Sequence, residues 1–296
     1  MRILLTGKNG QVGFELQRAL APLGELIAVD RSECDLESET SLREAIRRAE
    51  PDVIVNPAAY TAVDRAEGEA ERAHAVNAHA PGIIGAEAAR RRALVVHYST
   101  DYVFDGTATG RYAEDAMTGP QGVYGQSKLA GEKALSVSGA RYLVFRTSWV
   151  FGAHGANFAK TMLRLAAERD ELKVVADQVG APTSAALIAD VTAHAIRQAV
   201  RDGDGAADDI YHLAAGGETN WHAYACYVIE AARRAGRPVR VAADAILPIS
   251  TEDYPTPARR PANSRLDTAK LQQTFGLTLP HWQSGLDHVL QQIIRS

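Results

Sequence analysis

Short apolar runs alternate with longer helical patterns through the first half of the chain. The apolar runs fall at 2–6, 25–29, 52–56, 94–99 and 142–146. The segments between them, such as "QVGFELQRALAPL" and "SETSLREAIRRAE", carry apolar residues at helical spacing. Strands that are apolar throughout and separated by helices indicate a parallel sheet that is covered on both faces. The pattern therefore predicts a doubly wound α/β fold of the Rossmann type.

The regular alternation of predicted strands and helices ends at about residue 150. The pattern predicts a helix in "ANFAKTMLRLAAERD", a strand in "LKVVADQ", a helix in "AALIADVTAHAIRQAV" and a strand in "DIYHLAA". The acidic stretch "RDGDGAADD" before Ile210 is expected to be an exposed loop, and a Pro-rich segment with two further helices completes the chain. We therefore expect one large domain at 1–150, to which the chain returns around 173–213, and a smaller mixed region at 151–296.

Composition excludes several classes of protein. The 296 residues are 46% hydrophobic and 23% charged, which is ordinary for a globular protein. The net charge of −4, without a long basic run, gives no electrostatic reason to expect nucleic acid or a membrane as a partner. The sequence shows no membrane span and no signal peptide, and its 2 Cys have neither metal-type spacing nor a disulfide pattern. These features predict a cytoplasmic protein that acts on a small molecule.

Three glycines follow the first predicted strand and open the first predicted helix. Gly7, Gly10 and Gly13 in "TGKNGQVGFELQRAL" have the spacing G-x-x-G-x-x-G. Glycines there allow a tight turn and let backbone N–H groups approach a pyrophosphate, to which the helix N-terminus adds positive potential. The loop therefore predicts dinucleotide binding rather than a plain turn.

The end of the second predicted strand bears on the choice of dinucleotide. Asp30 stands where an acidic residue binds the ribose 2′-hydroxyl of NAD. Arg31 follows it, and is either a ligand for the 2′-phosphate of NADP or a solvated charge. Asp35 and Leu36 are expected to flank the adenine. The sequence leaves NADH and NADPH both open.

Tyr124 and Lys128 in "YGQSKLAGEK" lie four residues apart, so on a helix they share one face. Reduction of a carbonyl by hydride leaves an alkoxide that needs a proton, but a free phenol has a pKa of about 10. A neighbouring ammonium stabilises the phenolate and lowers that pKa, which makes Tyr124 a usable acid and base. Thr100 ends the fourth predicted strand, at the edge where ligands bind, and can orient the carbonyl. Surface decoration is the alternative, but the combination favours catalysis.

These motifs resemble the extended short-chain dehydrogenase/reductase superfamily and, within it, the dTDP-4-dehydrorhamnose reductase family. The resemblance runs nearly end to end, through "GKNGQVGFELQRAL", "STDYVFDG", "VYGQSKLAGEKAL", "FRTSWVFG", "NFAKTMLRLA", "DQVGAPTSA" and "YPTPARRPANSRLD". It implies reduction of the C4 ketone of dTDP-4-dehydro-L-rhamnose by NADPH or NADH, the last step of dTDP-L-rhamnose synthesis. Related dehydratases carry Thr-Asp-Glu at the strand end. This chain has Tyr102 in place of the Glu, which favours simple reduction.

The resemblance also assigns site residues. Tyr124 would be the proton donor, Lys128 its partner and a ligand of the nicotinamide ribose, and Thr100 the third catalytic residue. The residues expected around the cofactor are Gly7, Gly10, Gln11, Val12, Gly13, Asp30, Arg31, Asp35, Leu36, Ala59, Tyr60, Thr61, Tyr98 and Lys128. The residues expected around the dTDP-sugar are Thr100, Asp101, Tyr124, Trp149, Asn157, Arg259 and Arg260.

Several of these assignments have a structural alternative. Arg259 and Arg260 either clamp the diphosphate, because Arg suits bidentate phosphate contacts, or anchor a loop through a salt bridge. Asn157 either reaches the substrate or caps the helix that follows. Trp221 and Trp282 are assigned to core packing.

A metal and a dimer are weighed separately. Some members of the family are described as dimers bridged by magnesium through glutamates, and Glu15 matches one such position. Ala186 stands where another glutamate is expected, so Mg²⁺ is not supported by this sequence, and a homodimer stays open. The 9 His lack zinc-type spacing. None is assigned as a metal ligand, and His97 is expected to be a core residue with satisfied hydrogen bonds.

With the resemblance in place, the two parts of the chain receive functions. We expect 1–150 to bind NAD(P) and 151–296 to bind mainly the nucleotide sugar. Two rival functions remain open: a regulatory subunit of methionine adenosyltransferase, which would keep the fold and the cofactor pocket, and a reductase that makes dTDP-6-deoxy-L-talose.

Overall fold

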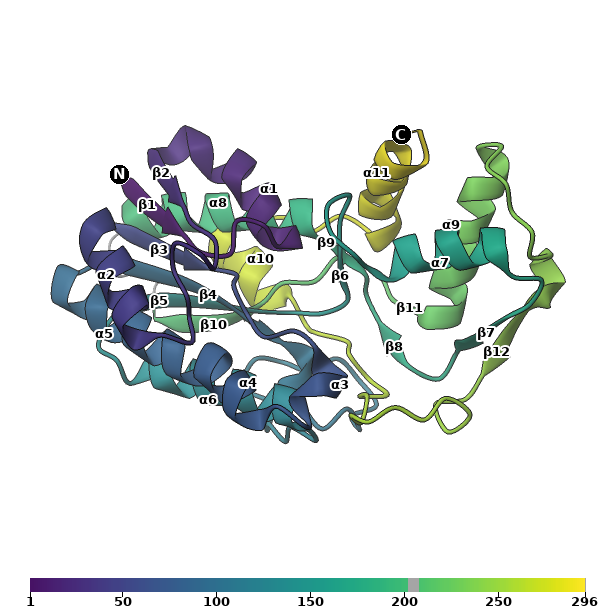
Figure 1. Ribbon diagram of the computed structural model, residues 1–296, viewed down its shortest axis with the longest axis horizontal. Coiled ribbons are helices and arrows are strands. Elements are labelled where there is room, and N and C mark those ends of the chain that lie inside the picture. The colour runs from purple at the N-terminus through teal and green to yellow at the C-terminus, as the bar shows by residue number, and fades with distance from the viewer. Residues whose placement is uncertain (202–207, 296) are drawn as a thin grey trace.

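The structure is a computed structural model that describes residues 1–201 and 208–295. A large sheet with helices on both faces forms one side of the molecule (Figure 1). A smaller region, built around helices α7 (Phe158–Glu168), α9 (Trp221–Arg234) and α11 (Trp282–Arg295), forms the other. The acidic loop expected from the sequence falls mainly on 202–207, outside the described residues.

Six parallel strands form the large sheet within the described residues. In spatial order they are β10 (Asp209–His212), β5 (Arg141–Thr147), β4 (Leu94–Thr100), β3 (Val53–Asn56), β1 (Arg2–Leu5) and β2 (Glu25–Ala28). The apolar runs of the sequence coincide with these strands, and the predicted doubly wound α/β class is confirmed. The strand order reverses between β1 and β3, which places a crevice at their carboxyl ends.

Helices cover both faces of this sheet. One face carries α1 (Gln11–Leu20), α8 (Ala185–Arg201) and α10 (Ala269–Phe275), and the other carries α2 (Glu39–Ala49), α5 (Ala80–Arg91) and α6 (Val123–Ser136). Alternate strand residues enter the two cores: Ile3 and Leu5 pack with α1 and α8, whereas Leu4 packs with α2 and α5. Burial on both sides explains why these strands are apolar throughout.

A separate core holds the smaller region together. It contains Phe151, Tyr224, Trp282 and Leu286, and lies among α7, α9, α11 and the parallel pair β7 (Leu172–Val175) and β12 (Ile246–Ile249). Two short pairs flank it: β8 (Val179–Gly180) with β11 (Thr219–Asn220), and β6 (Val150–Phe151) with β9 (Thr183–Ser184). β10 lies beyond residue 150 in the sequence but pairs with β5 in the large sheet. The division of the chain at residue 150 stays a prediction.

The helical segment after β3 is interrupted at a place that matters for the site. The short helix α3 (Val63–Ala66) precedes α4 (Ala70–His74), which runs through a π-helical turn (Ala75–His79) into α5. Pro81 in the first turn of α5 cannot donate a backbone hydrogen bond, and a π turn accommodates such a gap. Asn77 in this turn accepts a hydrogen bond from Tyr60 N (2.9 Å) and donates to Tyr60 O and Ser127 Oγ (3.0 Å each). The π turn thereby ties the loop after β3 to α6.

Candidate active site

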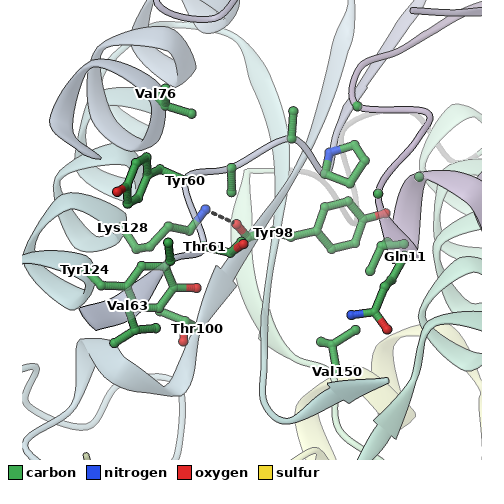
Figure 2. Close-up of a pocket in the computed structure, with 18 of the residues that line it drawn as sticks. Gln11, Tyr60, Thr61, Val63, Val76, Tyr98, Thr100, Tyr124, Lys128 and Val150 are labelled. Carbon is green, nitrogen blue, oxygen red and sulfur yellow. Dashed lines mark hydrogen bonds between the residues drawn. The ribbon is translucent and has the colours of Figure 1, made fainter. Parts of the chain in front are cut away.

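A cavity of about 890 Å³ lies at the carboxyl edge of the large sheet. That is the edge at which open α/β sheets bind ligands, and the volume is ample for a cofactor and a substrate. Figure 2 shows Tyr124 and Lys128 extending from α6 on one side of the cavity, with Gln11 and Val150 on the opposite side. The site is therefore assembled from both halves of the chain.

Most of the predicted site residues meet on the wall of this cavity. They are Gly7, Gly10, Gln11, Val12, Gly13, Arg31, Asp35, Leu36, Ala59, Tyr60, Thr61, Tyr98, Thr100, Asp101, Tyr124, Lys128 and Trp149. The predicted residues that lie off the wall are Asp30, Asn157, Arg259 and Arg260.

The glycine loop is shaped for close contact between backbone and ligand. Gly7 has φ +60°, which favours glycine, and accepts a hydrogen bond from Gly10 N at 3.0 Å. A Cβ on Gly13 would lie 2.0 Å from the carbonyl oxygen of Gly7, so only glycine fits there. No side chain caps α1 at Gly10, and the first turn of α1 lines the cavity and contains no acidic residue. This cradle fits the pyrophosphate of a dinucleotide.

After β2, Arg31 lines the cavity wall, whereas Asp30 does not. Asp30 Oδ1 accepts hydrogen bonds from Ser32 N (2.9 Å) and Ser32 Oγ (2.6 Å), which is an Asx turn. Arg31 donates from Nη2 to Glu37 Oε1 at 2.6 Å, and both residues line the cavity. The cavity wall at this end therefore includes the Arg31 guanidinium, and a contact between Asp30 and the cofactor stays a prediction.

Asn157 and Arg260 make the contacts of their structural alternatives. Asn157 Oδ1 accepts from Lys160 N at 3.1 Å and caps α7, and its Nδ2 donates to Gln11 Oε1 at 3.0 Å. Arg260 donates to Asp64 Oδ2 at 2.6 Å, which anchors the Pro-rich loop to α3. Asn157 therefore contacts Gln11, which lines the cavity, and does not line the cavity itself. Substrate contacts for either residue stay predictions.

Lys128 is buried and Tyr124 is half-buried, and desolvation governs both pKa values. Lys128 is 2% exposed, and its Nζ donates to Tyr98 O at 2.6 Å. Burial lowers the pKa of Lys128 to about 8, although the negative charge of Glu132 works in the opposite direction. Burial raises the pKa of Tyr124 to about 12, against the lowering effect of the Thr100 hydroxyl. The expected lowering of the phenol pKa is thus not found here, because desolvation outweighs it.

Polar groups with spare hydrogen-bonding capacity surround Thr100 at the ends of β4 and β5. Thr100 Oγ1 donates to Asp101 Oδ1 at 3.1 Å, and burial raises the pKa of Asp101 to about 6. Among the described residues, the buried hydroxyls of Ser99, Thr147 and Ser148 have no hydrogen-bond partner, and all three residues line the cavity. Buried hydroxyls without partners are costly, so they mark places for ligand groups.

Trp149 lies in the left-handed backbone region with φ +49°, which is unusual for a bulky residue. Its ring stacks on Trp221, with centroids 3.7 Å apart and 18° between the planes. A Cβ on Gly180 would lie 2.8 Å from the Trp149 ring, so glycine is needed there for the ring to fit. Trp221, assigned to the core from the sequence, therefore also positions a residue of the cavity wall. Trp282 is 5% exposed within the core of the smaller region.

Sequence reasoning missed part of the cavity wall. Thr147 ends β5 and Ser148 follows it, next to Trp149, so both could have been found from their place at a strand end. Arg65 and Arg72 reach the wall from the segment around α3 and α4. Nothing in the sequence spacing of Arg65 and Arg72 indicates that they line the cavity.

The expectations about metal and membrane can be compared with the described residues. These residues contain no group of three or more His, Cys, Asp or Glu side chains placed to hold a metal ion. Glu15 forms an ion pair with Arg18 at 3.5 Å, and the homodimer stays a prediction. No helix within 1–201 or 208–295 is long and apolar enough to cross a bilayer.

A glycine cradle at a strand–helix turn, facing a Tyr and a Lys one helical turn apart, defines the class: an NAD(P)-dependent oxidoreductase of the short-chain type. Comparisons with known proteins narrow this class. A family model described as the RmlD substrate binding domain matches residues 1–295. The dTDP-4-dehydrorhamnose reductase of Shigella flexneri is 53% identical over 297 residues, covering 99% of this chain and 98% of that protein.

Solved structures agree with the sequence comparison. A dTDP-4-dehydrorhamnose reductase from Clostridium acetobutylicum is 34% identical and superposes with a TM-score of 0.87, covering 98% of this chain and 99% of that one. The enzyme from Bacillus anthracis, in complex with NADP, is 32% identical with the same TM-score and coverage. The chain therefore belongs to the dTDP-4-dehydrorhamnose reductase family, whose NAD(P)H-dependent reaction is the final step of dTDP-L-rhamnose synthesis. The predictions of family and of a reductase are confirmed.

Proposed function

We propose that the cavity binds NADPH along the glycine loop and dTDP-4-dehydrorhamnose between α6 and the strand ends, and that Tyr124 protonates the reduced ketone. The observation that carries this proposal is the placement of Tyr124, Lys128 and Thr100 together on the wall of one cavity. When bound, NADPH supplies the hydride for C4 of the sugar. The NADP complex of the Bacillus anthracis relative supports this choice of cofactor.

The raised pKa of Tyr124 suits the direction of the reaction. With a pKa of about 12, the phenol is fully protonated at neutral pH and ready to donate. Donation leaves a phenolate in a buried site, where the charge of Lys128 is worth more than it would be in water. Lys128, with a pKa of about 8, is mainly charged at neutral pH. The pair therefore starts with the proton on Tyr124 and the positive charge on Lys128, as an acid catalyst requires.

Sugar recognition is assigned to the polar groups at the strand ends. Ser99, Thr147 and Ser148 offer buried hydroxyls without partners, and a sugar carries hydroxyl groups that can meet them. Thr100 can hold the ketone oxygen, and Trp149 offers an apolar face from the side of the smaller region. We assign the nucleotide part of the substrate to the region at 151–296.

Substitution of Tyr124 tests the proton donor. Tyr124→Phe should lower kcat by about 10²- to 10⁴-fold, the usual contribution of a general acid, and should leave NADPH binding nearly unchanged. Tyr102→Phe is the matched control. The Tyr102 ring packs edge-on against the Tyr124 ring, with centroids 5.4 Å apart, and the substitution removes only a hydroxyl. Oxidation of NADPH with the dTDP-ketosugar gives the rate, and cofactor fluorescence gives the affinity. Normal turnover by Tyr124→Phe would remove the proposed acid.

A further inference from the structure

A buried chain of hydrogen bonds lies behind Lys128. Thr6 Oγ1 donates to Asn56 Oδ1 at 2.6 Å, Asn56 Nδ2 lies 3.2 Å from His97 Nδ1, and Lys128 Nζ lies 3.4 Å from His97 Nε2. Each of the four side chains is at most 2% exposed. The chain crosses three strands of the sheet, from the end of β1 through β3 and β4 to α6, and ends on the ammonium group proposed for catalysis.

His97 is neutral in this setting. Burial first, and then the positive charge of Lys128, hold the pKa of His97 well below 6.5. A neutral imidazole donates through one nitrogen and accepts through the other. Nδ1 of His97 faces Asn56 and Nε2 faces Lys128. The tautomer of His97 therefore decides which of these two neighbours meets an N–H donor and which meets an acceptor.

The hydrogen-bond count at Lys128 decides the tautomer. A charged ammonium has three N–H donors and no acceptor. One donates to Tyr98 O at 2.6 Å, a second faces His97 Nε2 at 3.4 Å, and the third is left for the cavity that Lys128 lines. His97 Nε2 must then carry no proton, and Nδ1 must carry one.

Asn56 completes the link by turning its amide. An Nδ1–H on His97 needs an acceptor, and the side-chain oxygen of Asn56 supplies one when the amide turns it toward the ring; the backbone of Asn56 also hydrogen-bonds to His97. In the structure the amide nitrogen of Asn56 faces the ring, which is the orientation that suits a neutral amine at Lys128. A half-turn of the amide exchanges the two, and Thr6 can donate to the oxygen or accept from the nitrogen.

We infer that His97, backed by Asn56 and Thr6, is a positioning residue for the reduction: its Nε2 accepts a hydrogen bond from charged Lys128, fixes the ammonium group and keeps it protonated at working pH. This inference rests on the role proposed above for Lys128. His97 touches neither reacting group and acts through Lys128.

The other titratable groups near Lys128 do not replace this acceptor. Glu132, one turn further along α6, raises the pKa of Lys128 but binds Arg146 of β5 through both carboxylate oxygens. Tyr124 on α6 and Asp101 after β4 face the same cavity, and neither bonds to Lys128 Nζ in the contacts described above. Asn56 on β3 and Thr6 after β1 carry no charge. Loss of the His97 acceptor therefore leaves the ammonium with Tyr98 O as its hydrogen-bond partner and lowers the pKa of Lys128 further.

Two amide variants separate the two nitrogens of His97. The side chain of His97→Gln can place its oxygen where Nε2 lies, so it keeps the acceptor for Lys128. The shorter side chain of His97→Asn reaches only the Nδ1 position, so it keeps the contact with Asn56 and loses Lys128. The pH dependence of kcat should show activity falling on the alkaline side as Lys128 loses its proton. We expect His97→Asn to move that fall to lower pH by about one unit, and His97→Gln to keep it at the wild-type pH.

A direct titration keeps this test independent of catalysis. Carbon-13 NMR of labelled lysine in the cofactor-free protein follows the pKa of Lys128, which should fall in His97→Asn and hold in His97→Gln. Nitrogen-15 NMR of the unsubstituted protein at neutral pH should show a bare Nε2 and a protonated Nδ1 on His97, and needs no variant to fold. A protonated Nε2 there, or equal Lys128 titrations in all three proteins, overturns the inference. A shift in the Lys128 titration without a shift in the activity profile supports the hold of His97 on Lys128 and removes the catalytic role proposed for Lys128 instead.

Discussion

Arg146 and Glu132 join strand β5 to helix α6 through a buried, bidentate ion pair. Arg146 Nε donates to Glu132 Oε1 at 2.9 Å and Nη2 donates to Oε2 at 2.7 Å, with side-chain exposures of 4% and 2%. Glu132 lies one turn beyond Lys128, so the pair fixes the helix that carries the proposed acid. The guanidinium also lies over the ring of Phe104, 5.1 Å from its centroid.

Loss of one member of this pair should be costly to stability. Arg146→Met leaves the Glu132 carboxylate buried and unpaired, and we expect the free energy of unfolding to fall by about 3–5 kcal/mol. Arg164→Met is the matched control, because Arg164 pairs with Glu168 on the surface, where both side chains are at least half exposed, and should cost less than about 1 kcal/mol. Urea denaturation measures both. Equal losses in the two variants would contradict the buried pair's role.

The double variant Arg146→Met with Glu132→Leu refines the same experiment. It removes both charges together, so it leaves no unpaired carboxylate and should recover most of the loss. If the double variant is as unstable as Arg146→Met alone, the loss comes from packing rather than from a stranded charge.

Lys128 should make the free energy of unfolding depend on pH. Burial lowers its pKa from 10.5 to about 8 in the folded protein. Between these values the unfolded chain binds the proton and the folded protein does not, so the free energy of unfolding rises with pH. Relative to Lys128→Met, the wild type should gain about 3 kcal/mol from pH 8 to 10.5, and nothing below pH 8, where both states are protonated.

Urea denaturation of both proteins at steps across that window measures the difference. The comparison with Lys128→Met cancels the titration of other tyrosines and lysines, which the two proteins share. A difference that stays flat between the two values would show that Lys128 keeps an ordinary pKa on folding.

Trp221 should influence the substrate more than the chemistry. Its stack on Trp149 helps to hold a residue whose φ of +49° costs backbone energy. An aromatic pair is worth about 0.5–1.5 kcal/mol beyond burial, so Trp221→Ala should raise KM for the dTDP-sugar by about 3- to 10-fold with kcat nearly unchanged. Steady-state kinetics at saturating NADPH give both constants.

Trp282→Phe separates this effect from loss of stability. Trp282 is buried in the same core and packs on Tyr224 and Tyr227, away from Trp149. The variant should lower the melting temperature and leave KM at its wild-type value. A similar rise of KM in both variants would mean that Trp221 acts through the general stability of the smaller region.

The strands and the reactive helix could be predicted because their signals are local. A strand buried on both faces is mostly apolar, and β1, β3 and β4 are recognisable for that reason, although β3 ends in Asn56 and β4 contains His97. The spacing of Tyr124 and Lys128 also survives from sequence to structure, because helix geometry alone places them on one face.

The sequence does not show which site side chains are already bonded to neighbouring residues in the folded chain. Asp30 accepts hydrogen bonds from Ser32 two residues away, and Asn157 caps α7, so both side chains have local structural roles, and their ligand contacts stay predictions. Arg72 reaches the cavity because Asn77 and Tyr60, 17 residues apart, hold the loop after β3 in place. The pKa of Tyr124 depends on burial by the whole fold, which no spacing encodes. Such contacts join distant parts of the chain.

Arg31 gives the means to test the cofactor preference. Its guanidinium lines the cavity, whereas the Asp30 carboxylate is held by Ser32, so a ribose here meets a positive charge. A 2′-phosphate gains from this charge and a 2′-hydroxyl does not. Arg31→Ala should therefore raise KM for NADPH by about 2- to 5-fold, as expected for an exposed charge pair, and leave KM for NADH nearly unchanged.

Glu37 provides the opposite substitution. Its carboxylate binds Arg31 at 2.6 Å and also binds Arg72 at 2.9 Å, and it lines the same part of the cavity. Glu37→Gln removes a negative charge that repels the phosphate and competes for both guanidinium groups, so KM for NADPH should fall while KM for NADH changes little. Equal changes for the two cofactors in either variant would place the adenosine ribose elsewhere, because only a 2′-phosphate beside Arg31 makes the response depend on the cofactor.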